Sequence, residues 1–154
     1  MNNYSLLLKM IPKNTSKIIL YLLKNIDEFG HNINHISKAL NISVGSAFKI
    51  LKRLEQDNIA YHKEISNATH FKLNLDNDET IKICELLLLA EKRELKGYAK
   101  IYADEITKFE SAELIILFGT ILKNNKFNDV DVLFVSNQIK KVKNFFIINL
   151  WRLY

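Results

Sequence analysis

The chain of 154 residues has one cysteine, Cys84, one proline, Pro12, and only four glycines. A single cysteine cannot form an intramolecular disulfide bond. The four histidines are scattered, so cysteine and histidine together offer no spacing typical of a structural zinc site. This cysteine usage is typical of a reducing compartment, and we expect a cytoplasmic protein.

Long apolar runs are absent as well. The apolar residues 6–11 are too few to span a bilayer, and no basic region precedes them, so they fit neither a membrane helix nor a secretory signal. We expect no membrane partner. With 48% hydrophobic and 25% charged residues, the sequence predicts a folded protein of one ordinary domain or two small ones.

Arginine is scarce, with three among 22 basic residues. The chain is rich in Lys, Asn and Ile, a bias that AT-rich coding produces for any function, so the distribution of charge is more informative than the net charge of +5. Residues 1–75 hold ten Lys or Arg and five Asp or Glu, whereas residues 76–112 hold six and nine. Residues 113–154 hold six and three. The positive excess in the first part suits a phosphate-binding partner.

Residues 35–59 predict a helix-turn-helix. The pattern indicates a short helix over residues 35–40 that Asn34 caps, a turn at Asn41-Ile42, and a longer helix that follows a Ser43 cap. Such a pair of helices, at a steep angle to each other, suits insertion of the second helix into the major groove of DNA.

The longer helix is predicted to have two different sides. Apolar residues at Phe48, Leu51 and Leu54 indicate a buried side. The cap and the other side carry hydroxyl and basic groups, namely Ser43, Ser46, Lys49, Lys52 and Arg53. These groups suit contacts to phosphates and base edges. The alternative is an ordinary amphipathic helix with solvated lysines.

The flanking segments extend this pattern. A helix capped by Thr15 is expected to run to about Lys24, and a short strand is expected at residues 31–33. After the helix-turn-helix, residues 59–65 and 69–75 are predicted to pair as a β-hairpin. The second of these strands alternates polar residues with Phe71, Leu73 and Leu75.

In this order, residues 14–75 resemble the winged helix-turn-helix domain of small prokaryotic transcription regulators. The matching residues are Ala39, Leu40-Asn-Ile-Ser43, Leu51-Lys-Arg-Leu54 and Gln56-Asp-Asn-Ile59. The resemblance implies that double-stranded DNA is the partner, that the longer helix reads the groove, that the hairpin wing contacts phosphate or the minor groove, and that no cofactor is required. The residues it implicates in DNA binding are Ser43, Val44, Ser46, Lys49, Lys52, Arg53, Lys63, Asn67, His70 and Lys72.

The acidic residues 77–110 predict one long helix that connects two domains. Gly97 weakens it by ~1 kcal/mol relative to alanine. Its apolar residues recur mostly at intervals of three and four: Ile81, Cys84, Leu88, Leu95, Tyr98, Tyr102, Ile106 and Phe109. This stripe is either a packing face within one chain or a two-helix seam between subunits, and the second alternative predicts a homodimer.

Residues 111–154 contain two further strand patterns. The apolar residues 114–118 predict a buried strand, and Gly119-Thr120 follows it directly. A second strand pattern begins with Asp129-Val-Asp131. Residues two apart in a strand project to the same face, so Asp129 and Asp131 would present two carboxylates suited to Mg²⁺. The alternative is a turn that Asp129 caps. A helix over residues 138–146 and an apolar tail are expected to follow.

These residues resemble half of the minimal nucleotidyltransferase domain of the polymerase-beta type, over residues 110–137. The matches are Leu117-Phe-Gly-Thr120 and Asp129-Val-Asp-Val-Leu-Phe-Val135. The resemblance implies that Gly119 and Thr120 hold a nucleotide and that Asp129 and Asp131 hold Mg²⁺. The sequence departs from the family because Lys123-Asn-Asn-Lys126 replaces its Arg-Gly loop. In addition, none of the 23 residues after Asp131 is Asp or Glu, so no third carboxylate follows.

The expected fold class is therefore α+β. It comprises a winged helix-turn-helix domain over residues 1–76, a connecting helix over 77–110 and a truncated nucleotidyltransferase-like module over 111–154. The leading hypothesis is a sequence-specific DNA-binding transcription regulator in which this module is degenerate. The alternative is a Mg-dependent nucleotidyltransferase that takes a carboxylate from Glu105, Glu110 or a partner chain, although the missing carboxylate argues against an enzyme. A third alternative is a reading frame interrupted near its end.

Overall fold

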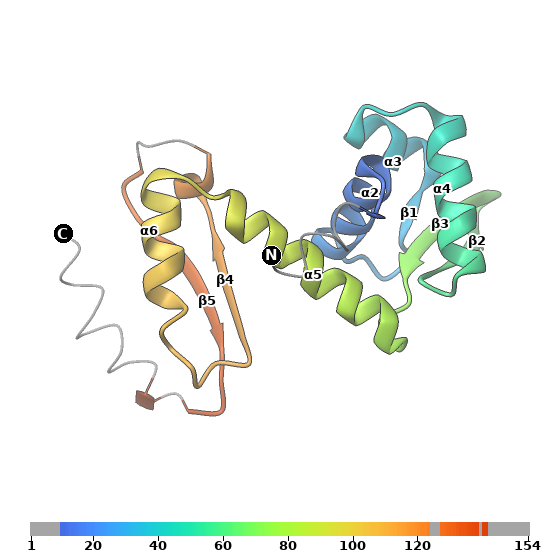
Figure 1. Ribbon diagram of the computed structural model, residues 1–154. Coiled ribbons are helices and arrows are strands. Elements are labelled where there is room, and N and C mark those ends of the chain that lie inside the picture. Colours follow the sequence, from blue (N-terminus) through green and yellow to red (C-terminus); the bar gives the residue numbers. More distant parts are fainter. Residues whose placement is uncertain (1–9, 124–126, 139, 142–154) are drawn as a thin grey trace. The chain divides into compact units, whose positions relative to one another are not determined.

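The computed structural model describes residues 10–123, 127–138, 140 and 141. The chain forms two compact units, Met1–Ala90 (unit 1) and Glu91–Tyr154 (unit 2), and the division falls within helix α5 (Asp78–Glu94) (Figure 1). The helix predicted over residues 138–146 and the apolar tail lie almost entirely outside the described residues.

Unit 1 combines helices with a three-stranded antiparallel sheet. Its described elements are, in order, α2 (Lys13–Lys24), β1 (His31–Asn32), α3 (Ile33–Leu40), α4 (Val44–Gln56), β2 (Ala60–Ile65), β3 (Ala68–Leu73) and α5. The strand order is β1-β3-β2, and His62 of β2 lies opposite Phe71 of β3. The predicted helix-turn-helix and hairpin are confirmed. Three helices and a hairpin in this order form a winged helix (Figure 1).

The starts of α3 and α4 are fixed by side-chain caps. Ser43 caps α4 as predicted, because its Oγ accepts a hydrogen bond from the Ser46 amide at 3.2 Å. The cap predicted for α3 at Asn34 is wrong: Asn32 Oδ1 accepts a hydrogen bond from the His35 amide at 2.8 Å, and Asn34 lies inside the helix. The short strand β1 therefore leads directly into α3.

Helix α2 also starts earlier than predicted. Pro12 is its N-cap, with φ −59° and ψ 142°, and Thr15 lies within the first turn. Proline has no amide hydrogen to satisfy, so it is well tolerated at the start of a helix.

Four elements of unit 1 each contribute a fully buried, large apolar side chain to its core. Ile18 of α2, Ile36 of α3, Leu51 of α4 and Phe71 of β3 are each 0% exposed. Full burial of side chains of this size contributes about 1.5–3 kcal/mol each relative to exposure. The core therefore holds the two helices of the helix-turn-helix against the sheet.

The buried side of α4 differs from the predicted one. Its buried residues are Ala47, Leu51 and Leu54, whereas Phe48 is 47% exposed. Residues 47, 51 and 54 have helical spacing, and so do residues 48, 51 and 54, so periodicity alone cannot separate the two sets. In the folded chain, the smaller Ala47 occupies the interior position. In β3, Phe71 and Leu73 are buried as predicted, but the strand ends before Leu75, which is exposed.

The single connecting helix predicted over residues 77–110 is two helices. Helix α5 ends at Glu94, and α6 (Gly97–Ile106) begins after a break at residues 95–96. Gly97 has φ +56°, a left-handed conformation that glycine adopts without the steric cost of a side chain. The apolar stripe predicted along one helix is therefore divided between α5, α6 and the residues that follow α6. Cys84, Tyr102, Ile106 and Phe109 are buried, while Ile81, Leu88 and Tyr98 are exposed.

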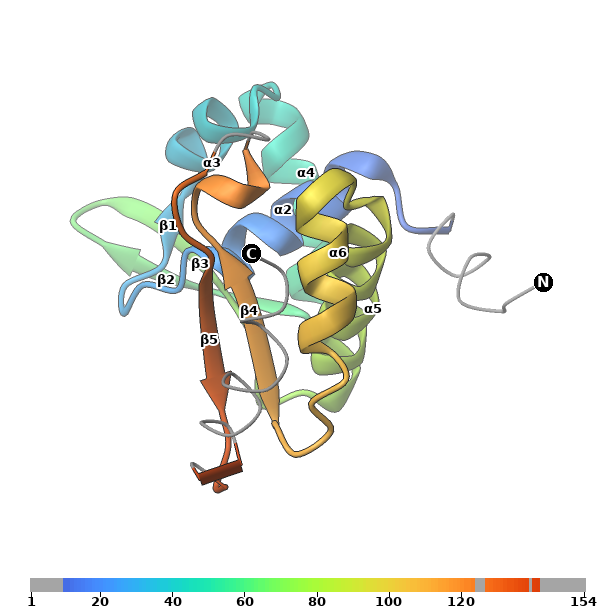
Figure 2. The same ribbon diagram turned by 90° about the vertical axis from the view of Figure 1, so that its left-hand side faces the viewer.

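Unit 2 pairs α6 with a two-stranded antiparallel sheet of β4 (Leu114–Phe118) and β5 (Asp131–Val135). The short 3₁₀ helix η1 (Thr120–Leu122) follows β4. Ala99 and Tyr102 of α6 pack with Ile121 and the partly buried Leu117, so that α6 lies against one face of the strands (Figure 2).

The other face of the β4–β5 pair is not covered by any element of the described part of the chain. Its apolar residues are between 40% and 49% exposed, and they are Leu114, Ile116, Phe118, Leu133 and Val135. Strand residues alternate between two faces, and among the described elements α6 covers only one, so the prediction of a buried strand at residues 114–118 is wrong for this face. Strand β5 begins at Asp131, and the exposed Asp129 lies before it.

Candidate nucleic-acid interface

The turn between α3 and α4 is built from local hydrogen bonds. Asn41 adopts the left-handed conformation, with φ 51° and ψ 51°, which asparagine tolerates better than most residues. Ser37 Oγ donates a hydrogen bond to the Ile42 carbonyl at 2.6 Å, and the Ile42 amide donates to the Ser37 carbonyl at 3.1 Å. These bonds fix the path of the chain from one helix to the next.

The predicted DNA-binding residues at the start of α4 and along it differ in their exposure to solvent and in whether they form ion pairs. Ser43, Val44, Lys49 and Arg53 are exposed, and Ser46 and Lys52 are half-buried. Lys52 Nζ donates a hydrogen bond to Glu55 Oε2 at 2.8 Å. Arg53 Nε lies 3.8 Å from Asp57 Oδ2, but its side chain is 81% exposed. Within the described part of the chain, Lys49 forms no ion pair.

The predicted DNA-binding residues of the wing also differ in their exposure and in their hydrogen bonds to the rest of unit 1. Lys63 and Asn67 are exposed, and Asn67 lies in the hairpin turn, where φ is positive at both Ser66 and Asn67. Positive φ at both central residues fits the twist of a tight hairpin. His70 Nδ1 hydrogen-bonds the Ala68 carbonyl at 3.0 Å. Lys72 Nζ donates to the Glu28 carbonyl at 2.9 Å, so its ammonium group supports the loop before β1.

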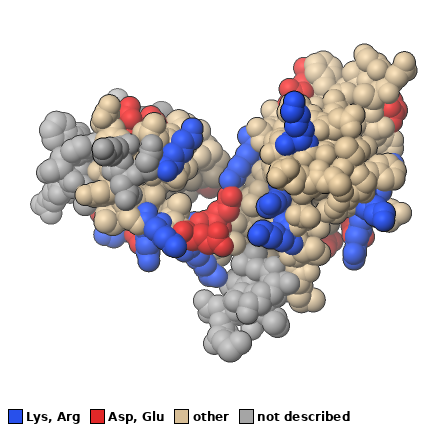
Figure 3. Space-filling view, turned by 90° about the horizontal axis from the view of Figure 1, so that it is seen from above, with Lys and Arg blue, Asp and Glu red and all other residues tan. Residues whose placement is uncertain are grey.

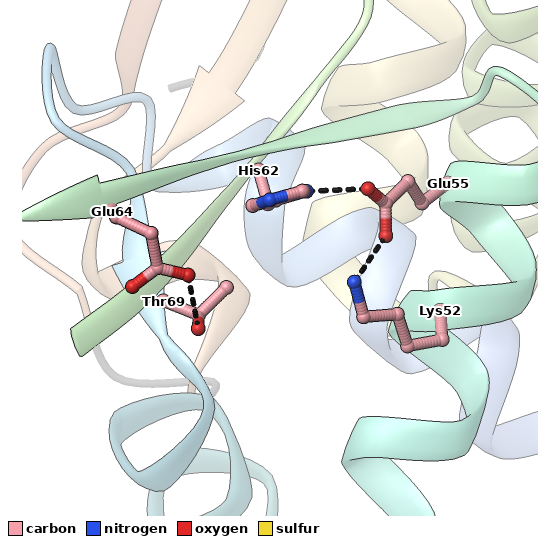
Figure 4. Close-up of polar contacts among 5 residues, drawn as sticks. All are labelled: Lys52, Glu55, His62, Glu64 and Thr69. Atoms are coloured by element: carbon pink, nitrogen blue, oxygen red, sulfur yellow. Dashed lines mark hydrogen bonds and ion pairs between the residues drawn. The ribbon is translucent and has the colours of Figure 1, made fainter. Parts of the chain in front are cut away.

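A network of polar side chains joins α4 to the wing (Figure 4). Glu55 receives the Lys52 hydrogen bond on one carboxylate oxygen, and its other oxygen pairs with His62 Nδ1 of β2. On the hairpin itself, Thr69 Oγ1 donates to Glu64 Oε1 at 2.6 Å. Periodicity could not reveal the Glu55–His62 contact, since it joins residues on different elements. The contact links strand β2 of the wing to α4.

This network makes the stability of unit 1 depend on pH. The hydrogen bond from Lys52 lowers the pKa of the Glu55 carboxyl below 4.5; partial burial opposes this effect, and His62 adds to it. The ionised carboxylate is therefore favoured in the folded state, so its contribution is complete above the unfolded-state pKa and is lost as the pH falls through the folded-state pKa.

We expect Glu55→Gln to lower the free energy of unfolding by about 1 kcal/mol near neutral pH, because the carboxylate is only partly buried. The difference from the parent protein should shrink as the pH falls below 4.5. Urea unfolding at a series of pH values measures it. Glu64→Gln on the hairpin is the control, because Glu64 contacts Thr69 within the same sheet. A Glu55→Gln effect that is independent of pH would contradict this account.

The basic side chains do not form one continuous patch on the face of unit 1 seen in Figure 3. Lys and Arg lie there in small separate groups, and wide areas carry neither sign of charge.

In unit 2, the structure brings two of the predicted nucleotide-site residues together. Gly119 has φ +88°, and a Cβ added to it would lie 2.1 Å from Asp131 Oδ2. The Asp131 carboxylate thus lies directly against the Gly119 backbone. Thr120 opens η1, and Asp129 is exposed before β5. In the described part of the chain, no group of three or more His, Cys, Asp and Glu side chains could hold a metal ion.

Among the described helices, none has both the length and the apolar composition needed to cross a lipid bilayer.

No protein-family model matches the sequence, and the search of curated proteins gave no significant match. Solved structures with a similar course of the chain include the adhesin competence repressor of Streptococcus pyogenes, with 18% identity over 66% of this chain and 70% of that chain and a TM-score of 0.48. MepR, a transcription regulator of the Staphylococcus aureus multidrug efflux pump MepA, has 18% identity over 68% and 81%, with a TM-score of 0.47. The S. aureus MepR–DNA complex gives 19% over 64% and 77%, with a TM-score of 0.45.

Proposed function

We propose that the protein is a sequence-specific DNA-binding transcription regulator. One observation carries the proposal: in unit 1, α4 is the second helix of a helix-turn-helix. One side of α4 is buried in the core, and the opposite side is exposed to solvent beside a wing. A helix of this kind fits the major groove, where base edges can be distinguished.

The exposed side chains divide into two roles. Lys49, Arg53 and Lys63 contact phosphates and supply affinity, while Ser43 and Ser46 at the start of α4 contact base edges or the nearest phosphate. Lys72 contributes mainly to the fold, because its ammonium group is held by the Glu28 carbonyl. DNA binding needs no cofactor in this arrangement, and it fits the expected cytoplasmic location.

Selection of duplexes from a random DNA pool by the full-length protein tests the proposal. We expect enrichment of one sequence motif, which then binds the protein in a gel-shift assay. A pool in which no motif is enriched, or an enriched motif that binds no better than a shuffled duplex, would contradict it.

We also propose that the protein binds DNA as a homodimer. Ile81 and Leu88 lie seven residues apart on α5, and they are 39% and 38% exposed, which is the spacing of a two-helix seam. A dimer predicts a palindromic motif with half-sites about one helical turn apart. Sedimentation equilibrium should detect a dimer that Ile81→Lys with Leu88→Lys dissociates; a parent protein that stays monomeric would refute this part.

A second candidate function, nucleotide transfer, rests on the contact between Gly119 and the Asp131 carboxylate in unit 2. In the polymerase-beta type resemblance, these positions hold phosphate and Mg²⁺. Incubation with Mg²⁺ and labelled nucleoside triphosphates should then give transfer that Asp129→Ala with Asp131→Ala abolishes, while Asp104→Asn on α6 leaves it unchanged. No transfer, or transfer that survives the double substitution, would remove this candidate.

A further inference from the structure

Two large apolar side chains are exposed at the start of α4. Val44 is 49% exposed and Phe48 is 47% exposed. They are four residues apart in the helix, so their side chains are neighbours on its surface. Between them in sequence, Gly45 is open as well, because a Cβ added there would meet no atom within 4 Å. The first turns of α4 thus present an apolar, uncrowded surface.

This surface lies on the side of α4 that faces the wing. Phe48, Lys52 and Glu55 are separated by four and then three residues, which places them along one side of the helix. Glu55 on this side is paired with His62 of β2. The apolar pair is therefore on the same side as the wing, about two to three turns nearer the N-terminus of the helix than Glu55.

The bases of duplex DNA offer one apolar group in the major groove, the C5-methyl group of thymine. Residues near the N-terminus of a helix-turn-helix recognition helix are the ones that reach base edges. Lys49 is adjacent to Phe48, is exposed, and forms no ion pair among the described residues, so it is available to a phosphate beside such a methyl group.

We propose that Val44 and Phe48 bind thymine C5-methyl groups and make thymine the preferred base at the positions they contact. The inference rests on the proposed DNA binding and adds to it the chemical group that is recognised. Val44 and Phe48 are then specificity-determining residues, while the surrounding lysines supply affinity that depends little on sequence.

Replacement of thymine by deoxyuridine in the selected duplex tests this directly, since uracil keeps the same hydrogen-bonding groups and lacks only the methyl group. For the full-length protein, we expect each contacted methyl group that is removed to weaken binding by about fourfold. Fluorescence anisotropy with thymine and deoxyuridine duplexes measures the ratio of the two affinities.

With the contacted methyl groups removed from the duplex, Phe48→Ala and Val44→Ala should each lower this ratio by about fourfold, and the double variant should bring it close to one. Phe29→Ala is the matched control, because Phe29 is 51% exposed in the loop before β1, and it should keep the ratio of the parent protein. Far-ultraviolet circular dichroism verifies that each variant is folded, and the deoxyuridine duplex tests the parent protein even where a variant does not fold.

Equal affinity of the parent protein for both duplexes would overturn the inference and leave the proposed DNA binding intact. A preference for thymine that persists undiminished in the folded double variant would show that other residues cause it, which also overturns the inference. Self-association that Phe48→Ala abolishes, with an unchanged ratio, would identify the pair as a protein interface instead. If no duplex binds at all, the proposed function itself fails.

Discussion

Reversal of two charges on α4, Lys49→Glu with Arg53→Glu, is expected to weaken binding to the selected duplex by about 100-fold at moderate salt concentration. Lys49 is exposed without an ion pair among the described residues, and the Arg53 side chain is 81% exposed. Each should contact a phosphate, and a glutamate there would repel it. Lys52 is unsuitable for this test because its substitution would also disturb Glu55 and the wing.

Lys17→Glu with Lys82→Glu is the matched control for this experiment. Both lysines are exposed in unit 1, on α2 and α5, and the substitutions change the net charge by the same amount. Binding should fall far less in the control than in the α4 variant. If the two variants lose affinity equally, the effect comes from net charge, and α4 is not the helix that contacts the DNA.

The second large effect concerns the core behind α4. Leu51→Ala is expected to lower the free energy of unfolding by about 3 kcal/mol, because Leu51 is 0% exposed and its truncation leaves a cavity. Phe48→Ala should cost less than about 1 kcal/mol, because half of this side chain is already in solvent. Chemical denaturation followed by circular dichroism measures both values.

Comparing the two variants shows whether Phe48 belongs to the buried side of α4 or to its exposed side. A Phe48→Ala effect as large as that of Leu51→Ala would place Phe48 in the core and remove the basis for thymine recognition. DNA affinity of Leu51→Ala, measured where the variant is still folded, should stay close to that of the parent protein, since Leu51 does not reach the surface.

The sequence was sufficient to predict the features of unit 1 that depend on neighbouring residues. The Ser43 cap is recognisable because its partner, Ser46, is three residues away. The alternation in β3 correctly places Phe71 and Leu73 in the core. Hydrogen bonding within a helix start and the two-residue period of a strand are local properties, and they survive in the folded protein.

Features that depend on distant residues could not be predicted. The choice between Ala47 and Phe48 depends on what α4 packs against, and both positions satisfy the helical period. Lys72, a DNA-binding candidate in the sequence, donates to the carbonyl of Glu28, 44 residues away, and no local pattern indicates this contact. The contact between Glu55 and His62 likewise joins a helix to a strand. Such pairings are visible only once the chain is folded.

In unit 2 as well, local sequence patterns were not sufficient to predict the structure. The break before Gly97 divides a stripe that reads as continuous in the sequence. The strand that begins at Asp131 leaves Asp129 outside, so the two carboxylates do not share one strand. Gly119 and Asp131 lie close together because Phe118, the neighbour of Gly119, pairs with Asp131 across the sheet, and this pairing also joins two separate strands.

The most direct test of DNA recognition by unit 1 is the affinity of the full-length protein for the selected duplex and for a shuffled duplex of the same composition, measured over a series of salt concentrations. We predict that the selected duplex binds at least about 1,000-fold more tightly, and that the logarithm of each affinity falls linearly with the logarithm of salt concentration, by about 0.9 for each phosphate contact. Equal affinity for the two duplexes, or binding that does not change with salt, would contradict the account.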